Sequence, residues 1–348
     1  MTEPDIEARK ADHLDLCATD DVAYRRRTTL LEQVELMHQS LPELSLDEID
    51  LSTELLGKTL RAPIVIVGMT GGHERAAEVN RGLASIAERR GYAFGLGSQR
   101  AMQKRPETTS TYQVRDVAPN VLLLGNLGVV QAAQQTTAQV RELVDAVGAD
   151  ALCVHLNPAQ ELIQPEGDRD FRGCVDALGR LVAELGVPVV AKETGNGISR
   201  HTAELLFDTG VRHVDVSGAG GTSWVGVETL RAQGHQRELG ELLWDWGVPT
   251  AAAVSYSAKA GLTTIATGGM RTGLDAARAI ALGAAAAGYA RNVFKAFVEG
   301  GEAQAQAFLD GVERELRVVM LLTGCRTLED LRRAPKLLGP DLSRWLAA

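Results

Sequence analysis

Cysteine is scarce in this sequence, and its four cysteines are far apart, at Cys17, Cys153, Cys174 and Cys325. They form no CxxC pair and have no histidine at zinc-ligand spacing, so the pattern predicts neither a disulfide framework nor a structural metal site. The sequence also lacks an apolar run long enough to cross a bilayer, and we expect no membrane contact. Its first residues, MTEPDIEARKADH, are polar and include acids, unlike a secretory signal or a transit peptide. These features predict a cytoplasmic protein with reduced cysteines.

Positive charge is not in excess either. The 36 lysines and arginines are outnumbered by 45 acids, which gives a net charge of −9. Nucleic acid would need a basic face, so this balance argues against it as a partner, although a local basic cluster can still hold a small anion. The hydrophobic share of 45% and the charged share of 23% are ordinary for a soluble α/β protein.

What the sequence does contain is a regular alternation of two kinds of segment. Amphipathic helical patterns, clearest at 76–91, 140–149 and 173–186, separate short apolar runs that are rich in β-forming residues. There are eight such runs, at 62–69, 92–97, 121–128, 151–156, 188–193, 213–218, 263–269 and 286–291. A repeated βα order predicts parallel pairing with helices outside, and nearly continuous apolar runs indicate strands covered on both faces.

We therefore predict an α/β fold, a (β/α)8 TIM barrel that forms one domain. Barrels of this size commonly fold as one unit, and the sequence has no linker, internal repeat or low-complexity tract. The predicted parts are an N-terminal extension at 1–58, the barrel at 59–291 and C-terminal helices at 292–348. The rival is an open doubly wound sheet, which would place GxGxxG after its first strand, where this chain has GMTGG.

Polar residues follow the predicted strands, and in a barrel the carboxyl ends of the strands converge on one mouth. The collected positions are Thr70, Ser98, Gln99, Arg100, Asn126, His155, Asn157, Gln160, Glu161, Lys192, Glu193, Ser217, Gly268, Gly269 and Arg271. A strand that only fills a core does not need such side chains at its end. The set therefore predicts an active site.

The densest group lies in HLNPAQELIQPEGDRDF, residues 155–171. Glu161 is suited to a hard cation such as Mg²⁺, which often binds one carboxylate together with substrate phosphates. Gln160 is a poor acid and base, so we expect it to orient a substrate or relay a proton, with His155 and Asn157 positioning the substrate. A structural explanation is equally open, with Asn157 capping a helix whose first residue is a proline.

Several segments are candidates for binding phosphate. The run TGGMRTGL places two glycines before a helix that we expect to begin at Thr272 or Gly273, where free N–H groups attract anions. The loop SGAGGTS offers two hydroxyls, Ser217 and Thr222, among small residues. Tight turns alone would also explain these glycines.

Basic residues at the predicted mouth suit an anion in the same way. Arg100 follows a strand, whereas Arg9, Lys10 and His13 cluster near the amino terminus, where a solvated surface patch is the plain alternative. Lys192 ends a strand and needs a partner when buried. An anionic cofactor or Glu193 would satisfy it, and a plain internal salt bridge is the alternative.

At this point the chain resembles the type 2 isopentenyl-diphosphate isomerases, the flavin-dependent class. The resemblance runs through RKADH, MTGG, GSQR, GNLG, HLNPAQELIQPEGDRDF, KETGNGIS, SGAGGTSW, DWGVPTAA and GGMRTGLDAARAIALGA, which together span nearly all of the chain. The string around Gln160 and Glu161 is highly specific to that family, whereas the glycine loops are shared with other flavin barrels.

The resemblance implies a (β/α)8 barrel that holds FMN at its mouth and requires Mg²⁺ and reduced flavin, with NADPH supplying the electrons. It implies interconversion of isopentenyl and dimethylallyl diphosphate without net redox change, in a homo-oligomer of four or eight chains. By motif, the implied FMN contacts are Gly68, Met69, Thr70, Ser98, Asn126, Lys192, Ser217, Thr222, Gly269, Met270, Arg271, Tyr289 and Ala290. The implied substrate contacts are Arg9, Lys10, His13, Ser98, Arg100, His155, Asn157 and Gln160. Gln160 and His155 are the implied catalytic residues, and Glu161 the metal ligand, joined by Glu228.

Three alternatives stay open beside this resemblance. In the first, the chain is a related flavin barrel that acts on a longer prenyl substrate, for example in proton-initiated cyclisation. In the second, the chain is a flavin barrel that oxidises a 2-hydroxy acid. Such an enzyme needs a catalytic base, and we see no dedicated His and Arg pair after the sixth and seventh strands. The third is a flavin-binding module without catalysis.

Overall fold

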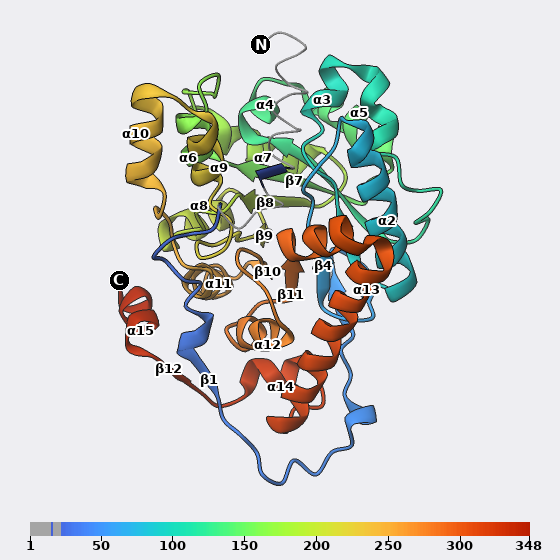
Figure 1. Cartoon of the computed structure of the whole chain (residues 1–348), viewed down its shortest axis with the longest axis vertical. Coiled ribbons are helices and arrows are strands. Elements are labelled where there is room, and N and C mark those ends of the chain that lie inside the picture. The colour runs from blue at the N-terminus through green and yellow to red at the C-terminus, as the bar shows by residue number, and fades with distance from the viewer. Residues whose placement is uncertain (1–14, 17–21) are drawn as a thin grey trace.

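The computed structural model describes residues 15–16 and 22–348, and its centre is a closed barrel of parallel strands (Figure 1). Around the barrel the strands follow the order β10-β11-β4-β5-β6-β7-β8-β9. Their bounds are β4 Ile64–Ile66, β5 Ala93–Gly95, β6 Leu122–Gly128, β7 Ala151–Leu156, β8 Val189–Glu193, β9 His213–Asp215, β10 Thr263–Ala266 and β11 Ala286–Tyr289. Each lies within one of the eight predicted runs, so the prediction of a (β/α)8 barrel is confirmed.

Helices surround the barrel, as the alternating pattern predicted (Figure 1). Those after the first four strands are α2 Glu74–Arg90, α3 Arg100–Lys104, α4 Val129–Ala133, α5 Thr137–Val147, α6 Pro158–Ile163 and α7 Cys174–Glu184. Those after the second four are α8 Arg200–Asp208, α9 Trp224–Arg231, α10 Gly234–Leu243, α11 Thr250–Lys259, α12 Gly273–Ala281 and α13 Arg291–Leu322, and then α14 Leu328–Arg333 and α15 Pro340–Ala347. Short 3₁₀ helices occupy Leu31–Gln33, Leu46–Glu48 and Pro106–Thr111.

Local sequence signals set the helix ends. In α5 the Thr136 side chain accepts from the backbone N–H of Gln139, whose side chain bonds back to Thr136, and the helix ends at Gly148 with φ 62°. Helix α13, the first of the predicted C-terminal helices, bends where Gly300 and Gly301 leave helical geometry.

Two separate apolar clusters hold the barrel. The larger lies between the strands and the surrounding helices and includes Ile64, Leu123 and Val154. The smaller fills the barrel interior and includes Val65 and Leu124. Because alternate residues of a strand face opposite sides, neighbouring strand residues belong to different clusters. The interior cluster leaves the carboxyl ends of the strands to polar residues.

The chain termini close the opposite end and flank of the barrel. The antiparallel hairpin β2 (Thr53–Leu55) and β3 (Lys58–Leu60) contributes Leu55 and Leu60 to the interior cluster. Strand β1 (Val34–Leu36) pairs with β12 (Lys336–Leu338), so a segment that precedes the barrel lies beside one that follows it (Figure 1). These segments pack against the barrel and its helices.

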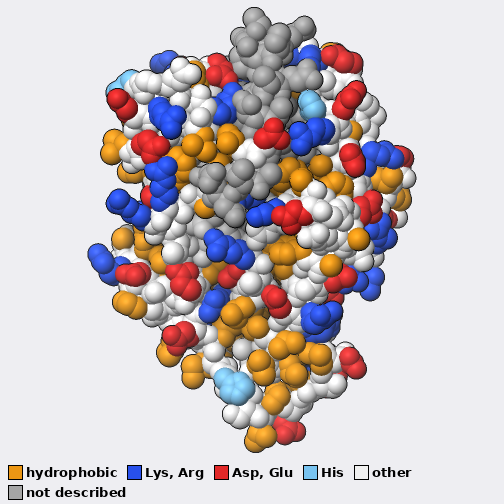
Figure 2. Space-filling model, viewed as in Figure 1, with side chains coloured by type: hydrophobic (Ala, Val, Ile, Leu, Met, Phe, Trp, Pro, Cys, Tyr) orange, Lys and Arg blue, Asp and Glu red, His pale blue; other side chains and the backbone are white. Residues whose placement is uncertain are grey.

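The described part of the chain contains no helix that is long and apolar enough to span a membrane. Cys153, Cys174 and Cys325 are free thiols, whereas Cys17 lies outside the described residues. On the face drawn in Figure 2, described lysine and arginine side chains alternate with aspartate and glutamate, and they do not merge into a continuous basic surface.

Candidate active site

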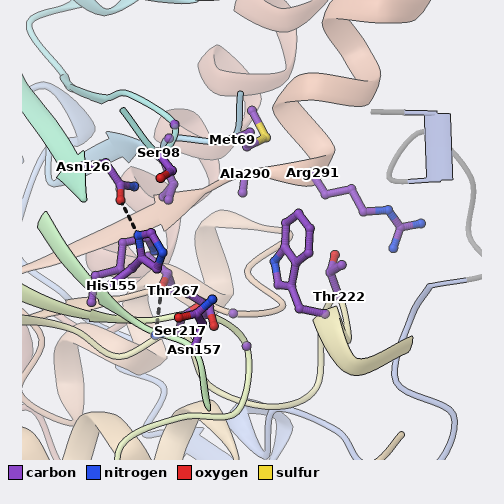
Figure 3. A pocket seen from close by; sticks show the side chains of 18 of the residues that line it. Met69, Ser98, Asn126, His155, Asn157, Ser217, Thr222, Thr267, Ala290 and Arg291 are labelled. Carbon is purple, nitrogen blue, oxygen red and sulfur yellow. Dashed lines mark hydrogen bonds between the residues drawn. The ribbon is translucent and has the colours of Figure 1, made fainter. Parts of the chain in front are cut away.

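A cavity of about 290 Å³ opens at the carboxyl ends of the barrel strands. Figure 3 shows side chains from several strands and their following loops turned toward this shared space. Of the residues predicted from sequence, those that line it are Gly68, Met69, Thr70, Ser98, Arg100, Asn126, His155, Asn157, Gln160, Glu161, Lys192, Ser217, Thr222, Gly268, Gly269, Met270, Arg271 and Ala290. The barrel therefore brings together motifs spread over more than 200 residues of sequence.

Seven predicted residues are not among them. Gln99, Glu193 and Glu228 are buried but do not line the cavity. The Tyr289 side chain lies outside the barrel wall, where its hydroxyl donates to the Thr272 carbonyl at 2.9 Å and its ring packs edge-on against Phe308. Arg9, Lys10 and His13 lie outside the described residues.

His155, on β7, is held by a neighbouring strand. Its Nδ1 lies 2.8 Å from Oδ1 of Asn126 on β6, and the Asn126 amide nitrogen donates to the Leu96 carbonyl (Figure 3). Burial, with the positive charges of Lys192 and Arg100, lowers the pKa of His155 to about 4. The imidazole is therefore neutral near pH 7, and since Asn126 Oδ1 accepts from Nδ1, Nε2 is left as a hydrogen-bond acceptor.

The carboxamides and carboxylate after β7 form one hydrogen-bonded group. Asn157 Nδ2 donates to Glu161 Oε1 at 2.9 Å, while Gln160 Nε2 donates to Glu228 Oε1, on α9, at 3.0 Å. Asn157 is the N-cap residue of α6, and Pro158 is the first helical residue, as expected. The Asn157 side chain, however, caps no backbone N–H. The predicted side-chain cap is wrong because the Asn157 amide is bound to Glu161 instead.

Glu161 is 6% exposed, and both of its carboxylate oxygens are engaged. Oε1 accepts from Asn157, and Oε2 accepts from the backbone N–H of Asp168 at 2.8 Å. Among the described residues, no group of three or more His, Cys, Asp or Glu side chains is placed to hold a metal. The donor set therefore fits Mg²⁺ only if a bound ligand, such as a diphosphate, supplies most of the oxygens.

Arg100 lies beside the same group. Its Nη1 is 3.9 Å from Asp168 Oδ2, an oxygen that also accepts from Gln131 Nε2 at 2.8 Å. A guanidinium this loosely paired can turn to a bound phosphate without breaking a close ion pair. Asp168 and Gln131 were not singled out from the sequence, because no periodic pattern marks a residue that supports another across the mouth.

Lys192, on β8, forms an internal salt bridge, one of the expected alternatives, with a residue that no sequence pattern singled out. Its Nζ lies 2.7 Å from Oδ2 of Asp215, on β9, and not against Glu193. The Glu193 carboxylate instead accepts the backbone N–H groups of Gly195, Asn196 and Gly197. Strand alternation could have identified Asp215, since β8 and β9 pair Lys192 directly with it.

Two glycine loops meet at the rim. A Cβ at Gly221 would lie 2.3 Å from the Gly269 nitrogen, so the loops after β9 and β10 touch backbone to backbone. Helix α12 begins after Thr272, as predicted, but the amides of Arg271 and Thr272 donate to Asp275 and that of Gly273 to Glu315. The expectation of free N–H groups at these positions is therefore wrong, because carboxylates of the protein already bind them.

A strap, defined as residues 22–29, crosses these loops on the way to the barrel. Ala23 bridges to Thr222, and Tyr24 donates its N–H to the Gly221 carbonyl at 2.9 Å and its hydroxyl to the Gly195 carbonyl at 2.7 Å. Asp245 Oδ1 accepts the backbone N–H groups of three successive strap residues, Arg25 to Arg27, at 2.9, 3.1 and 3.3 Å. The strap therefore fixes the position of two cavity-lining loops.

Comparison with known proteins gives a consistent result. The family FMN-dependent dehydrogenase matches residues 3–160 and 155–337. The isopentenyl-diphosphate delta-isomerase of Methanosarcina barkeri is 46% identical over 332 residues, covering 94% of this chain and 90% of that protein. That of a Synechococcus strain is 47% identical over 342 residues, covering 97% and 98% of the two chains.

Solved structures resemble this chain in fold. A mandelate oxidase variant with a monooxide FMN adduct superposes with a TM-score of 0.68 at 20% identity, covering 93% of this chain and 95% of that one. At this identity the match concerns the barrel and not the chemistry. Because the sequence matches extend over nearly the whole length and the barrel is of the FMN-dependent type, the chain belongs to the isopentenyl-diphosphate delta-isomerase family, in its flavin-dependent class.

Proposed function

We propose that this enzyme interconverts isopentenyl diphosphate and dimethylallyl diphosphate by proton transfer, using reduced FMN and Mg²⁺ without net redox change. One observation carries the proposal. The carboxylate in the cavity wall, Glu161, and the one behind it, Glu228, are both engaged in hydrogen bonds, and the His155 imidazole is neutral. Shifting the double bond requires protonation of an unactivated alkene, and these groups are poor donors to carbon. We therefore assign the proton donor to a bound cofactor.

The cavity wall suits a flavin. The backbone at Gly68, Gly221 and Gly269 lines the cavity, where a planar ring would lie against it, and Lys192 adds a buried ammonium group. FMN in its reduced form supplies a proton donor and an electron-rich ring face beside the alkene. In this proposal the chain binds and orients the ring through the cavity residues named above, Tyr289 contributes through its backbone, and NADPH is the cellular reductant.

The diphosphate of the substrate would occupy the side of the cavity where Ser98, Arg100, His155 and Asn157 meet. His155 would accept a hydrogen bond through Nε2, the nitrogen that Asn126 leaves available, and Arg100 would supply the positive charge. Glu161 would bind Mg²⁺ together with diphosphate oxygens, joined by Glu228. The basic residues Arg9, Lys10 and His13 remain part of this proposal through the family resemblance.

Gln160 would position the reacting carbons. Its carboxamide lines the cavity and is oriented by Glu228, which is itself fixed by Arg231 at 2.6 Å. A neutral amide can hold a hydrogen bond throughout the reaction because it does not change its charge.

The test is an anaerobic assay of the purified protein with isopentenyl diphosphate, FMN and Mg²⁺, with and without NADPH or dithionite. The proposal expects dimethylallyl diphosphate only in the reduced samples. Product without reduction would contradict the role of reduced flavin. FMN binding without turnover would favour a flavin-binding module, and activity with a longer prenyl diphosphate alone would favour the cyclisation alternative.

Two further parts of the proposal do not rest on the cavity. A cytoplasmic location is expected from the sequence, and a homo-oligomer of four or eight chains is implied by the family resemblance. Sedimentation of the holoenzyme measures the oligomeric state directly, and a monomer would contradict it.

A further inference from the structure

Asp215 is a buried carboxylate at the mouth of the barrel whose contacts all involve groups next to the cavity. It is 4% exposed. Its Oδ2 accepts from Lys192 Nζ at 2.7 Å, while its Oδ1 accepts from the Thr267 hydroxyl and, at 3.3 Å, from the Ser217 backbone N–H. Lys192, Thr267 and Ser217 all line the cavity, so the carboxylate stands directly behind three parts of its wall.

The barrel fixes this arrangement through strand register. Lys192 on β8 pairs directly with Asp215 on β9, and Asp215 pairs on its other side with Ile265 on β10, two residues before Thr267. Side chains directly opposite each other on neighbouring strands lie within reach. The contact is therefore set by the backbone of three strands and does not depend on a mobile loop.

The energetics of burial give this contact a consequence for the cavity. The Lys192 and Asp215 side chains are 9% and 5% exposed, so both charges are largely withdrawn from water. Burying an isolated ammonium at this depth would cost free energy. Its electrostatic field would also act on the cavity without screening by water. Paired with a carboxylate at hydrogen-bond distance, it is close to a neutral dipole.

We propose that Asp215 is a positioning residue that fixes the Lys192 ammonium at the floor of the cavity and cancels its charge there, so that a bound flavin meets an ion pair and not a lone cation. This inference rests on the proposed function for the presence of the flavin. It concerns a residue that neither the sequence motifs nor the family comparison singled out.

The proposal makes a directional statement about reduction. A positive charge beside a ring that accepts electrons stabilises the reduced form, and a neighbouring negative charge offsets that effect. Removing the negative charge of Asp215 while leaving Lys192 in place therefore makes the bound flavin easier to reduce. Its midpoint potential shifts to a more positive value.

The test compares Asp215→Asn with the wild-type holoenzyme by spectroscopic redox titration of bound FMN. The matched control is Asp150→Asn, because Asp150 also binds a lysine, Lys58 at 2.8 Å, an arginine, Arg115 at 2.7 Å, and a backbone N–H. Asp150 precedes β7 at the opposite end of the barrel and does not line the cavity. We expect a positive shift in Asp215→Asn and the wild-type potential in Asp150→Asn. An unchanged potential in Asp215→Asn overturns the proposal.

A double-mutant cycle separates action through Lys192 from a general structural effect. Lys192→Met removes the ammonium. Adding Asp215→Asn to this variant should therefore shift the flavin potential much less than adding it to the wild type does. The double variant also removes both buried charges together, which folded proteins tolerate better than loss of one partner. An equal shift in both backgrounds would show that Asp215 does not act through Lys192.

The midpoint potential is measured on bound FMN and does not require catalytic turnover. A wild-type protein that binds FMN but fails to isomerise its substrate would contradict the proposed function, and the redox comparison would still decide the role of Asp215.

Discussion

Gln160 donates a hydrogen bond from Nε2 to Oε1 of Glu228 over 3.0 Å, and this bond decides which face of its carboxamide meets the cavity. Because the nitrogen is bound to Glu228, the oxygen is the atom turned to a ligand, and it accepts only a long bond, 3.4 Å, from Asn157. Glu228 is fully buried. The carboxamide is therefore oriented from behind by a residue that a substrate does not touch.

The first prediction concerns this carboxamide. Gln160→Ala should lower kcat by about 10² to 10⁴, the range typical of a lost group that positions a proton transfer. FMN affinity should stay near the wild-type value, because the predicted flavin contacts lie elsewhere. Steady-state kinetics and flavin fluorescence measure the two. Gln103→Ala is the control, since Gln103 is exposed and bonds Gln135 on the surface; equal activity of Gln160→Ala would remove Gln160 from the mechanism.

The second prediction concerns the metal. Glu161→Gln keeps the size of the side chain but leaves one oxygen where two now accept hydrogen bonds from Asn157 and the Asp168 N–H. The variant should need a higher Mg²⁺ concentration for half-maximal activity, while it retains FMN. The measurement is activity against added Mg²⁺ after treatment with a chelator. Glu184→Gln, altered at an exposed side chain that bonds Thr137, should follow the wild-type curve. An unchanged Mg²⁺ curve in Glu161→Gln would exclude Glu161 as a ligand.

The sequence predicted the fold well because strand and helix signals are local. Apolar runs and amphipathic periods report burial within a few residues, and the order of elements then leaves few topologies. The cavity wall followed because the carboxyl ends of parallel strands must share one mouth. Residues such as Ser98 and Asn126, far apart in the chain, were thereby placed in the same site before the structure was known.

What the sequence could not give was the partner of each polar side chain. For Lys192 the sequence left open an anionic cofactor, Glu193 or another internal salt bridge. Adjacent residues on a strand point to opposite faces, and the lysine binds Asp215 on the neighbouring strand. Asn157 was expected to cap a helix, yet a buried carboxylate four residues later competes for its amide. Such choices depend on distances between elements, which periodicity does not encode.

The third prediction is a dependence of stability on pH. The pKa of His155 in the folded protein is about 4, below the ordinary value of 6.5, so the unfolded chain takes up this proton first as the pH falls. As the pH falls, protonation of His155 in the unfolded chain therefore lowers the free energy of unfolding. The loss begins near pH 6.5 and is complete below about pH 4, whereas His155 causes no change above pH 7. In His155→Asn this part of the acid sensitivity should disappear. Urea unfolding at several pH values measures it, and His235→Asn, at a highly exposed site, serves as the control. Parallel curves for wild type and His155→Asn would contradict the shift.

The fourth prediction concerns the strap. Asp245→Ala removes the acceptor of the Arg25, Arg26 and Arg27 N–H groups, and hydrogen bonds to a charged acceptor are worth about 1.5–3 kcal/mol before partial exposure reduces them. We expect the free energy of unfolding to fall by about 1–2 kcal/mol. The exposed pair of Asp145 with Arg141 gives the control, since Asp145→Ala should change stability by less than about 1 kcal/mol. Equal stability of the two variants would mean that the strap is not held by Asp245.

The fifth prediction concerns the contact between the two glycine loops at the rim of the cavity. An added Cβ at Gly221 would lie 2.3 Å from the Gly269 nitrogen and 2.6 Å from its Cα, and neither backbone atom can move as the end of a flexible side chain can. Gly221→Ala must therefore push apart the loops after β9 and β10, and these loops carry Thr222 and Met270 in the cavity wall. We expect weaker FMN binding, seen as a higher dissociation constant in a fluorescence titration, with the barrel still folded by circular dichroism.

Gly311→Ala is the control for this change. Gly311 lies within α13, where an added Cβ meets nothing within 4 Å, and alanine favours a helix more than glycine does, by about 1 kcal/mol. This variant should bind FMN like the wild type and be as stable or more so. If Gly221→Ala also binds FMN with the wild-type dissociation constant, the close approach of the two loops does not shape the cofactor site, and the cavity must tolerate their separation.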